Sequence, residues 1–501
     1  MGRGRTAAQA LAALAIIATA CLLHWGDSVG AFFFLDDYWL LQTSAAIRGD
    51  GISDLWQVFV PSHVGFLLYR PLTQAGYFVA LGHLFGVDAA AYHAVHLLAA
   101  IANVMLAFGL AWRLTRSWFA GLATALLFAA APGLIVAVFW IAAFTMTGSA
   151  MALLLLLWCW LASRGWARRV GCTLLQAVAL LASEHAVVGP LLLALLEWAT
   201  PERRRWRDLL GPAALVAAYL LAKAIYFATT GLPGGGYALS LDPRVWITSL
   251  GYYAAACLNL LTLNVASPQG WTRLGVAVLL IALATAVAGL RAPRWRVAAA
   301  GWGVFIVALL PVLPLADHRY AYFIGLAGVG AWLAVVATLQ QLGRVWRPLV
   351  LVLYAAVLIT DWSTEEAAAR DSIFHLVVKG GRAAGLWYAA VDAAGRDPST
   401  QAIFVPRTPT TEIVFDRDQR ARLFMQRAMP VVLYSQPELP PLPAGIAVVA
   451  FAPDELPPGY AWPGSGGRWH WVFELLAAPR RALSEALRPA GAPVGTDAAS
   501  R

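Results

Sequence analysis

Two adjacent carboxylates, Asp36 and Asp37, follow the first long apolar run of the chain in the sequence FFFLDDYW. Carboxylates beside a membrane surface are costly to desolvate, so both are expected to face water or a polar cavity. There a carboxylate can take the proton of an attacking hydroxyl as a general base, or it can ligate a divalent cation. The alternative is a hydrated loop with incidental acids. We favour Asp36 as the base, because Asp37 can equally pair with a basic group.

Basic side chains in two other segments are candidates for binding a phosphate group. Arg70 can hold a phosphate by a bidentate charge-assisted contact, and His63 precedes it in the same expected loop. His318, Arg319 and Tyr320 lie in a short turn between two apolar runs, where a basic cluster suits an anionic head group. The structural alternatives are an interfacial snorkelling arginine at the first segment and an aromatic-belt anchor at the second.

Glu184, His185 and Lys223 interrupt apolar stretches. Ionisable residues at membrane depth usually face the interior of a helix bundle, so we include these three among the substrate-binding candidates. A purely structural polar contact is the other interpretation. His93 and His96 stand near the start of an apolar run and are expected to be packing or interfacial residues rather than ligands.

Several classes of function are disfavoured by what the sequence lacks. It has no Walker A, GxGxxG, HExxH or GxSxG motif, which argues against an ATPase, a dehydrogenase, a metalloprotease and a serine hydrolase. The formal charge of +9 comes from short basic clusters, with no basic stripe interleaved with aromatic residues, so nucleic acid is not an expected partner. The four cysteines lie in apolar runs and are expected to be core residues.

The elements that must position these residues are predicted to be membrane-spanning helices. The 501 residues are 60% hydrophobic and only 13% charged, far from the composition of soluble domains. Apolar stretches of about 20 residues, each able to cross a hydrocarbon core of about 30 Å, recur along the chain. Eleven spans are predicted, near residues 7–25, 91–112, 117–133, 143–163, 170–183, 186–200, 209–229, 271–290, 297–315, 321–340 and 348–362.

Arginine placement predicts the orientation of these spans. With the N-terminus in the cytoplasm, every inner segment is basic, whereas the short outer loops contain few arginines. The candidate site residues then all map to the outer face of a cell membrane. Two larger regions also lie outside, a loop over 26–90 and a C-terminal segment over 363–487, with a Pro/Gly/Ala-rich tail over 488–501 that is expected to be disordered.

The C-terminal segment is predicted to form a small α/β domain outside the membrane. Its β-like runs are separated by Pro-rich turns, and they comprise Ala402–Val405, Glu412–Phe415, Val431–Tyr434 and Ile446–Ala450. The expected fold is therefore an all-α polytopic membrane domain over 1–362, followed by this extracytoplasmic domain.

An ordered set of short motifs resembles the GT-C superfamily of polyprenyl-phosphate-sugar-dependent glycosyltransferases. The closest likeness is to the O-mannosyltransferase-like branch that includes the transmembrane and tetratricopeptide-repeat proteins. The motifs cover about residues 10–340 and are Asp36-Asp37-Tyr38, Tyr69-Arg70-Pro71-Leu72, Leu84-Phe85-Gly86-Val87, Tyr92–Leu98, Leu127-Phe128-Ala129 with Pro132, Trp140-Ile141, Ser183-Glu184 before Pro190, and Arg319–Tyr322 before Gly325.

The resemblance implies that the acidic pair lies at the active site and that an acceptor hydroxyl displaces the lipid phosphate with inversion at the anomeric carbon. It also implies a polyprenyl-phosphate-linked sugar as donor, a protein, lipid or glycan as acceptor, and a divalent cation as the one cofactor left open. The chain departs from the pattern in three places. No lysine separates Ser183 from Glu184, His318 replaces an acid before Arg319, and tetratricopeptide repeats are absent. The alternative function is a transporter, flippase or polymerase of lipid-linked saccharides.

Overall fold

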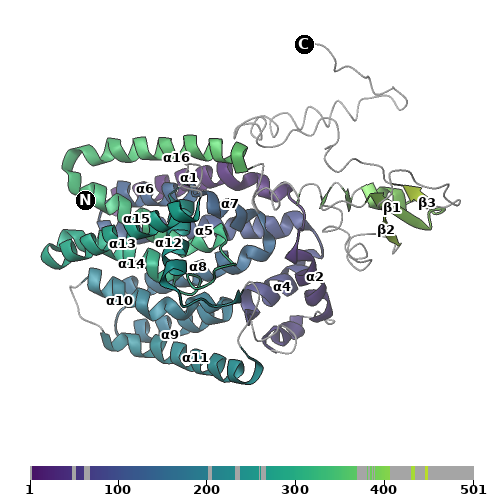
Figure 1. Cartoon of the computed structure of the whole chain (residues 1–501), viewed down its shortest axis with the longest axis horizontal. Coiled ribbons are helices and arrows are strands. Elements are labelled where there is room, and N and C mark those ends of the chain that lie inside the picture. Colours follow the sequence, from purple (N-terminus) through teal and green to yellow (C-terminus); the bar gives the residue numbers. More distant parts are fainter. Residues whose placement is uncertain are drawn as a thin grey trace, which may run out of the picture. The chain divides into compact units, whose positions relative to one another are not determined.

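The computed structural model of the chain describes a set of residues that covers most of the helical part and short pieces of the C-terminal part. These are residues 3–47, 52–60, 68–200, 206–231, 237–258, 260, 267–368, 381, 384, 385, 387, 388, 390–406, 430–434 and 446–448. The described chain is mostly α-helical (Figure 1). Residues up to Leu456 form one compact unit.

The α-helices follow one another with short connections. They are α1 (Arg3–Trp25), α2 (Asp36–Ile47), α4 (Tyr77–Phe85), α5 (Ala89–Thr115), α6 (Trp118–Ala129), α7 (Pro132–Phe139), α8 (Phe144–Ala162), α9 (Gly165–Ala182), α10 (Gly189–Ala199), α11 (Leu210–Thr230), α12 (Pro243–Cys257), α13 (Pro268–Arg291), α14 (Arg296–Leu309), α15 (Gly325–Leu339) and α16 (Trp346–Ala368). Short 3₁₀ or π turns join several of them, including η1 (Gly26–Gly30), η2 (Ile52–Phe59), η3 (Pro71–Gly76), η4 (Ile141–Ala143), η5 (Glu184–Val188), η6 (Trp206–Leu209), η8 (Pro293–Trp295), η9 (Ala321–Ile324) and η10 (Gln340–Val345).

The expectation of a mostly α-helical membrane protein is met. Within the described part of the chain, six helical stretches are long and apolar enough to cross a membrane, or seven if α6 and α7, bent by 68°, form one broken span. The six are Ala7–Gly30, Ala89–Thr115, Ile141–Ala162, Trp206–Thr230, Pro268–Arg291 and Ala321–Leu358. The last includes the predicted span 321–340 and most of the predicted span 348–362, and it is broken at Gly343, whose φ is 71°.

Three predicted spans correspond to helices outside this set. The spans expected near 170–183, 186–200 and 297–315 are α9, α10 and α14, and α10 has only 11 residues. At a rise of about 1.5 Å per residue, such a helix is much shorter than a hydrocarbon core. The count of eleven spans therefore stays a prediction.

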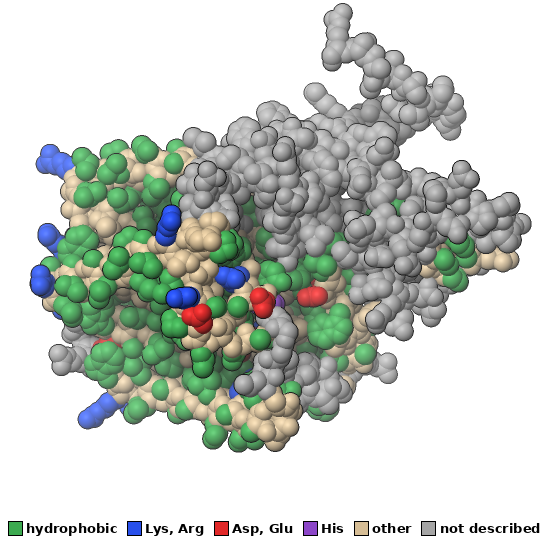
Figure 2. Space-filling view, viewed as in Figure 1, with side chains coloured by type: hydrophobic (Ala, Val, Ile, Leu, Met, Phe, Trp, Pro, Cys, Tyr) green, Lys and Arg blue, Asp and Glu red, His purple; other side chains and the backbone are tan. Residues whose placement is uncertain are grey.

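The surface of the helical part is apolar over large areas (Figure 2). Large hydrophobic side chains are exposed along α11, α13 and α16, among them Leu221, Ile225, Leu283 and Val352. In a soluble monomer, apolar patches this extensive are rare, whereas lipid-facing helices require them. Most of the charged side chains at the left edge of Figure 2 are Lys or Arg.

Small residues allow close helix packing in the core. A Cβ atom on Gly251 of α12 would lie 1.7 Å from the carbonyl oxygen of Trp271 in α13. A Cβ atom on Gly275 of α13 would likewise lie 2.0 Å from the carbonyl oxygen of Ile247. In lipid, no hydrophobic driving force acts between helices, so small residues that let the helix backbones approach closely contribute to helix association. Cys21, Cys172 and Cys257 are buried in the core as free thiols, as expected.

The described strands form a three-stranded parallel sheet in the order β2-β1-β3, from β1 (Ala402–Pro406), β2 (Val431–Tyr434) and β3 (Ile446–Val448). Ile403 pairs with Val431 on one side of β1 and with Ala447 on the other. Three of the four predicted β-runs are thereby confirmed. The fourth, 412–415, and the tail over 488–501 lie outside the described residues. The boundary expected at 362 falls within α16.

Candidate functional site

A cavity of about 430 Å³ collects five of the ten predicted site residues. These five are Asp36, Arg70, Glu184, His185 and His318. They come from the start of α2, the residue before η3, the first two residues of η5 and the segment before η9. Side chains separated by as many as 282 positions in the sequence therefore share one cavity, and the rest of its wall is largely aromatic and aliphatic.

The two adjacent aspartates have different surroundings. Asp36 is exposed and lines the cavity, whereas Asp37 is almost completely buried. The carboxylate of Asp37 accepts hydrogen bonds from the backbone N–H of Phe34 at 2.9 Å and of Ala142 at 2.6 Å. Burial raises the pKa of Asp37 well above its usual range, against the effect of these two donors. Asp37 thus pairs with backbone groups and not with a basic side chain, the partner that the sequence suggested.

Arg70 and Glu184 form an ion pair that was not predicted from the sequence. The Nε of Arg70 donates to Glu184 at 2.7 Å, and Nη2 donates to the other carboxylate oxygen, so the contact is bidentate. Burial opposes ionisation of Glu184, but the guanidinium more than offsets it and lowers the pKa of Glu184 to about 2. Both groups are therefore charged at neutral pH. The Nη1 nitrogen of Arg70 lies outside this contact and has N–H groups of its own.

Two histidines and a tyrosine also line the cavity. The ring of His318 lies 4.4 Å from that of Tyr237, and His185 packs edge-on against Phe323 at 5.2 Å. Burial lowers the pKa of His185 to about 4 and also lowers the pKa of His318, and the charge of Arg70 contributes to both shifts. Both imidazoles are accordingly neutral at pH 7. They can donate or accept one hydrogen bond each without adding charge.

The other predicted site residues that the structure describes do not line this cavity. Lys223 is buried on α11, with its amino group 5.7 Å from the ring centroid of Tyr219. The guanidinium of Arg319 lies 6.0 Å from the Trp271 ring, and Tyr320 stacks on Tyr322 at 5.2 Å. His63 lies outside the described residues. His93 and His96 are buried in α5, as expected of packing residues.

Aromatic residues that were not chosen from the sequence contribute much of the cavity wall. Trp39, Trp140, Tyr237 and Tyr322 all line it, and Trp140 meets Tyr322 edge-on at 5.7 Å. Trp140 and Tyr322 belong to two of the short motifs, but nothing in those motifs separates a wall residue from a core residue. Tyr237 follows a run of glycines, and no motif in the sequence around it indicated a place in the site.

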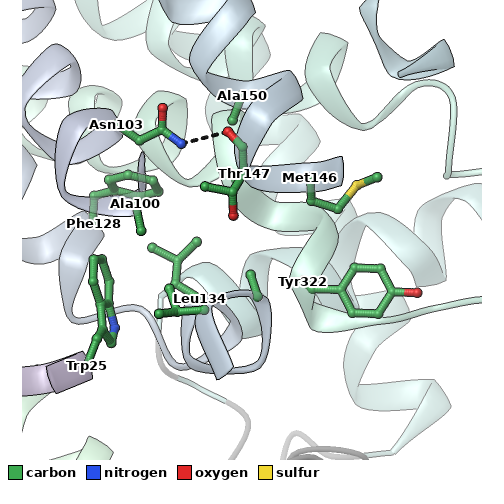
Figure 3. Close-up of a pocket in the computed structure, with 12 residues that line it drawn as sticks. Trp25, Ala100, Asn103, Phe128, Leu134, Met146, Thr147, Ala150 and Tyr322 are labelled. Carbon is green, nitrogen blue, oxygen red and sulfur yellow. Dashed lines mark hydrogen bonds between the residues drawn. The ribbon is translucent and has the colours of Figure 1, made fainter. Parts of the chain in front are cut away.

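A second, much smaller hollow of about 20 Å³ is lined by residues of several helices (Figure 3). Met146 and Tyr322 line both cavities. Asn103 donates to the backbone carbonyl of Thr147 beside the small one, and the Tyr322 hydroxyl points away from it. Its walls are otherwise apolar, which marks it as a packing defect rather than a substrate site.

Metal ligands do not gather at the candidate site. No group of three or more His, Cys, Asp or Glu side chains within the described ranges is arranged to hold a metal ion. Among the three predicted carboxylates, Asp37 accepts hydrogen bonds from backbone N–H groups and Glu184 pairs with Arg70. Asp36 and Glu184 both line the cavity, and Asp36 is the more exposed of the two.

No protein-family model matches this chain, and a search of curated proteins finds no match to it either.

Proposed function

We propose that this protein is an integral membrane glycosyltransferase of the GT-C type. It would transfer a sugar from a polyprenyl-phosphate-linked donor to an acceptor hydroxyl, with inversion at the anomeric carbon. The observation that carries the proposal is the shared cavity, in which the Asp36 carboxylate and the Arg70 guanidinium line one space large enough for a sugar ring. A base and a cation are the two charged groups that this displacement requires.

Each step of the displacement has a group to serve it. The Asp36 carboxylate takes the proton of the acceptor hydroxyl as its oxygen forms the new bond to the anomeric carbon. The bond from that carbon to the phosphate oxygen breaks, and its electron pair stays with the polyprenyl phosphate. Arg70, held in place by Glu184, stabilises the negative charge of the leaving phosphate through the donors that Glu184 does not use.

An apolar side of the cavity suits a lipid-linked donor. Phe227 near the end of α11 lines the cavity together with Leu239 and Leu315. Leu239 and Leu315 are joined by an antiparallel backbone bridge, so these two apolar side chains lie close together in the wall. The outward face of α11 carries exposed Leu221 and Ile225, so a polyprenyl chain can follow this helix from the bilayer.

The proposal includes the orientation of the chain in a cell membrane. Eleven spans, an N-terminus in the cytoplasm and a C-terminal α/β domain outside place the acidic loop on the non-cytoplasmic side. The arginine distribution in the sequence supports this arrangement.

Purified protein in detergent or nanodiscs, incubated with radiolabelled polyprenyl-phosphate sugars and cell-envelope fractions, tests the function. We expect label to move into the acceptor fraction, and Asp36→Asn to slow the transfer by roughly 10²- to 10⁴-fold, as is typical when a general base is removed. Asp392→Asn, which lies in the C-terminal part and away from the cavity, is the matched control.

Two results would count against the enzyme. Transfer at the parental rate by an Asp36→Asn, Asp37→Asn double variant would exclude this mechanism. Movement of labelled lipid between leaflets of a vesicle without any bond to acceptor would instead identify a flippase.

A further inference from the structure

The loop over 31–35, which leads directly to Asp36 at the start of α2, is held between two parts of the chain. On one side, Asp37 binds the backbone N–H of Ala142 in η4 and so ties the loop to the helical bundle. Residues 31–34 belong to no helix or strand, and Leu35 has a φ of 51°. A left-handed conformation at a leucine is unfavourable by itself and persists only where its surroundings enforce it.

The other side of the loop contacts a helical segment near the C-terminus. The backbone N–H of Phe32 donates to the carbonyl oxygen of Gly381 at 3.1 Å. The Tyr388 ring lies 5.2 Å from that of Phe32 and 6.1 Å from that of Tyr38. Tyr388 therefore contacts side chains on both flanks of Asp36, four residues before it and two residues after it.

The spacing of these contacts identifies one face of the C-terminal segment. Positions 381, 385 and 388 follow the i, i+4, i+7 pattern of a single helix face. A Cβ atom on Gly381 or Gly385 would lie 3.1 or 3.2 Å from an atom of Phe32, so this face is shaped to admit the loop closely. Neighbouring side chains of the segment, Trp387 and Val391, are buried in the same core as Phe33 and Tyr38.

From these contacts we infer that the segment around residues 381–391 positions the Asp36 carboxylate, and that Tyr388 is its main positioning residue. The inference rests on the proposed function, since positioning has meaning only for a reacting group. Displacing a reacting group by about 1 Å can lower a rate roughly a hundredfold. The C-terminal part of the chain is then a component of the active site and not an independent appendage.

Tyr388→Ala in the full-length protein tests the role of this residue. We expect the rate constant of a single turnover to fall roughly ten- to a hundredfold while the Kd for the labelled donor is unchanged, because Tyr388 does not line the cavity. Tyr388→Phe keeps the ring and should retain the parental rate. Arg396→Ala, which removes an exposed ion pair with Asp392 on the same segment, is the control for a general disturbance.

A disulfide provides a test of the packing that does not depend on activity. The ideal Cβ position at Gly381 lies 3.8 Å from the Cβ atom of Ala31, within the range that a disulfide spans. The pair Ala31→Cys, Gly381→Cys should oxidise to a cross-link, detected by mass spectrometry, whereas each single variant should not. When the cysteine pair is combined with Tyr388→Ala, oxidation should also restore most of the transfer rate that Tyr388→Ala loses. Reduction of the disulfide should remove this gain.

Each outcome bears on a different claim. Failure of the pair to cross-link would overturn the packing. A cross-link with no loss of rate in Tyr388→Ala, or with a loss that oxidation does not restore, would overturn the positioning role. If the cysteine pair cross-links but the parental protein transfers no sugar to any acceptor, the proposed function is refuted and, with it, this role of Tyr388, while the contact itself stands.

Discussion

The two adjacent aspartates, Asp36 and Asp37, have the same side chain but different surroundings. Asp36 opens onto the cavity, while Asp37 is enclosed and accepts two backbone hydrogen bonds. A carboxyl group has two acceptor oxygens, whereas an amide has one oxygen and an NH₂ group that can only donate. Replacing Asp37 by Asn therefore places an NH₂ group against a backbone N–H, although the size of the side chain hardly changes.

We expect Asp37→Asn to destabilise the protein by about 1–3 kcal/mol, the usual cost of an unsatisfied buried group. Asp36→Asn should leave the unfolding temperature unchanged and affect only transfer. Unfolding of both variants in detergent, followed by tryptophan fluorescence, separates the two effects. Equal unfolding temperatures for parent and Asp37→Asn would show that the two backbone contacts are not needed for the fold.

Arg70 and Glu184 are a second case in which the effect of a substitution depends on the partner. Removing one member leaves the other charged and largely shielded from water, with side-chain exposures of 14% and 26%. Arg70→Ala and Glu184→Gln should each lower stability, and the double variant should cost less than the sum, with a coupling of about 0.5–3 kcal/mol. A double-mutant cycle of unfolding free energies measures it. Strict additivity would mean that the pair contributes nothing beyond its separate members.

Arg70→Ala should in addition slow transfer about ten- to a hundredfold, because a charge-assisted contact contributes roughly 1.5–3 kcal/mol. Glu184→Gln should slow it less, since the guanidinium remains.

At the scale of elements, the pattern of apolar runs and turns predicted most of the helices and three strands, because both depend on local periodicity. Arginine placement assigned all ten candidate site residues to one face, and five of them line the cavity. Which arginine turns toward the cavity could not be predicted, since Arg70 and Arg319 occupy similar interfacial positions and only the packing around each fixes its direction. The pairing of Arg70 with Glu184 joins positions 114 apart, and no local pattern carries that information.

Helix packing offers a prediction at this scale. Gly251→Ala places a methyl group 1.7 Å from the carbonyl oxygen of Trp271. Because the methyl carbon is fixed to the α12 backbone and the oxygen belongs to the α13 backbone, the two helices must separate. Overpacking of this kind costs about 1–3 kcal/mol. The unfolding temperature should fall accordingly, whereas Gly30→Ala, where the added Cβ meets nothing within 4 Å, should not change it. If both variants unfold with the parent, α12 and α13 are not in close contact.

For the whole molecule, the side on which the C-terminal part lies depends on how three short helices cross the membrane. α9, α10 and α14 are short. Near the start of α9, Arg168 and Arg169 pair with Asp208. A hairpin of α9 and α10 that enters and leaves on one side would preserve the orientation of everything after it. A single crossing by the two helices together would reverse it, and the C-terminal part would then lie on the cytoplasmic side.

Reporter fusions decide between these arrangements. With the N-terminus inside, green fluorescent protein fused after residues 205 and 292 should fluoresce, because both follow an even number of spans and both sites adjoin arginine clusters. Alkaline phosphatase should be active only when fused after residue 370, which follows the eleventh span. Fluorescence at 370 would place the C-terminal segment, and with it the loop around Asp36 that it contacts, in the cytoplasm. In that case the donor and the acceptor would both have to be sought on the inner leaflet.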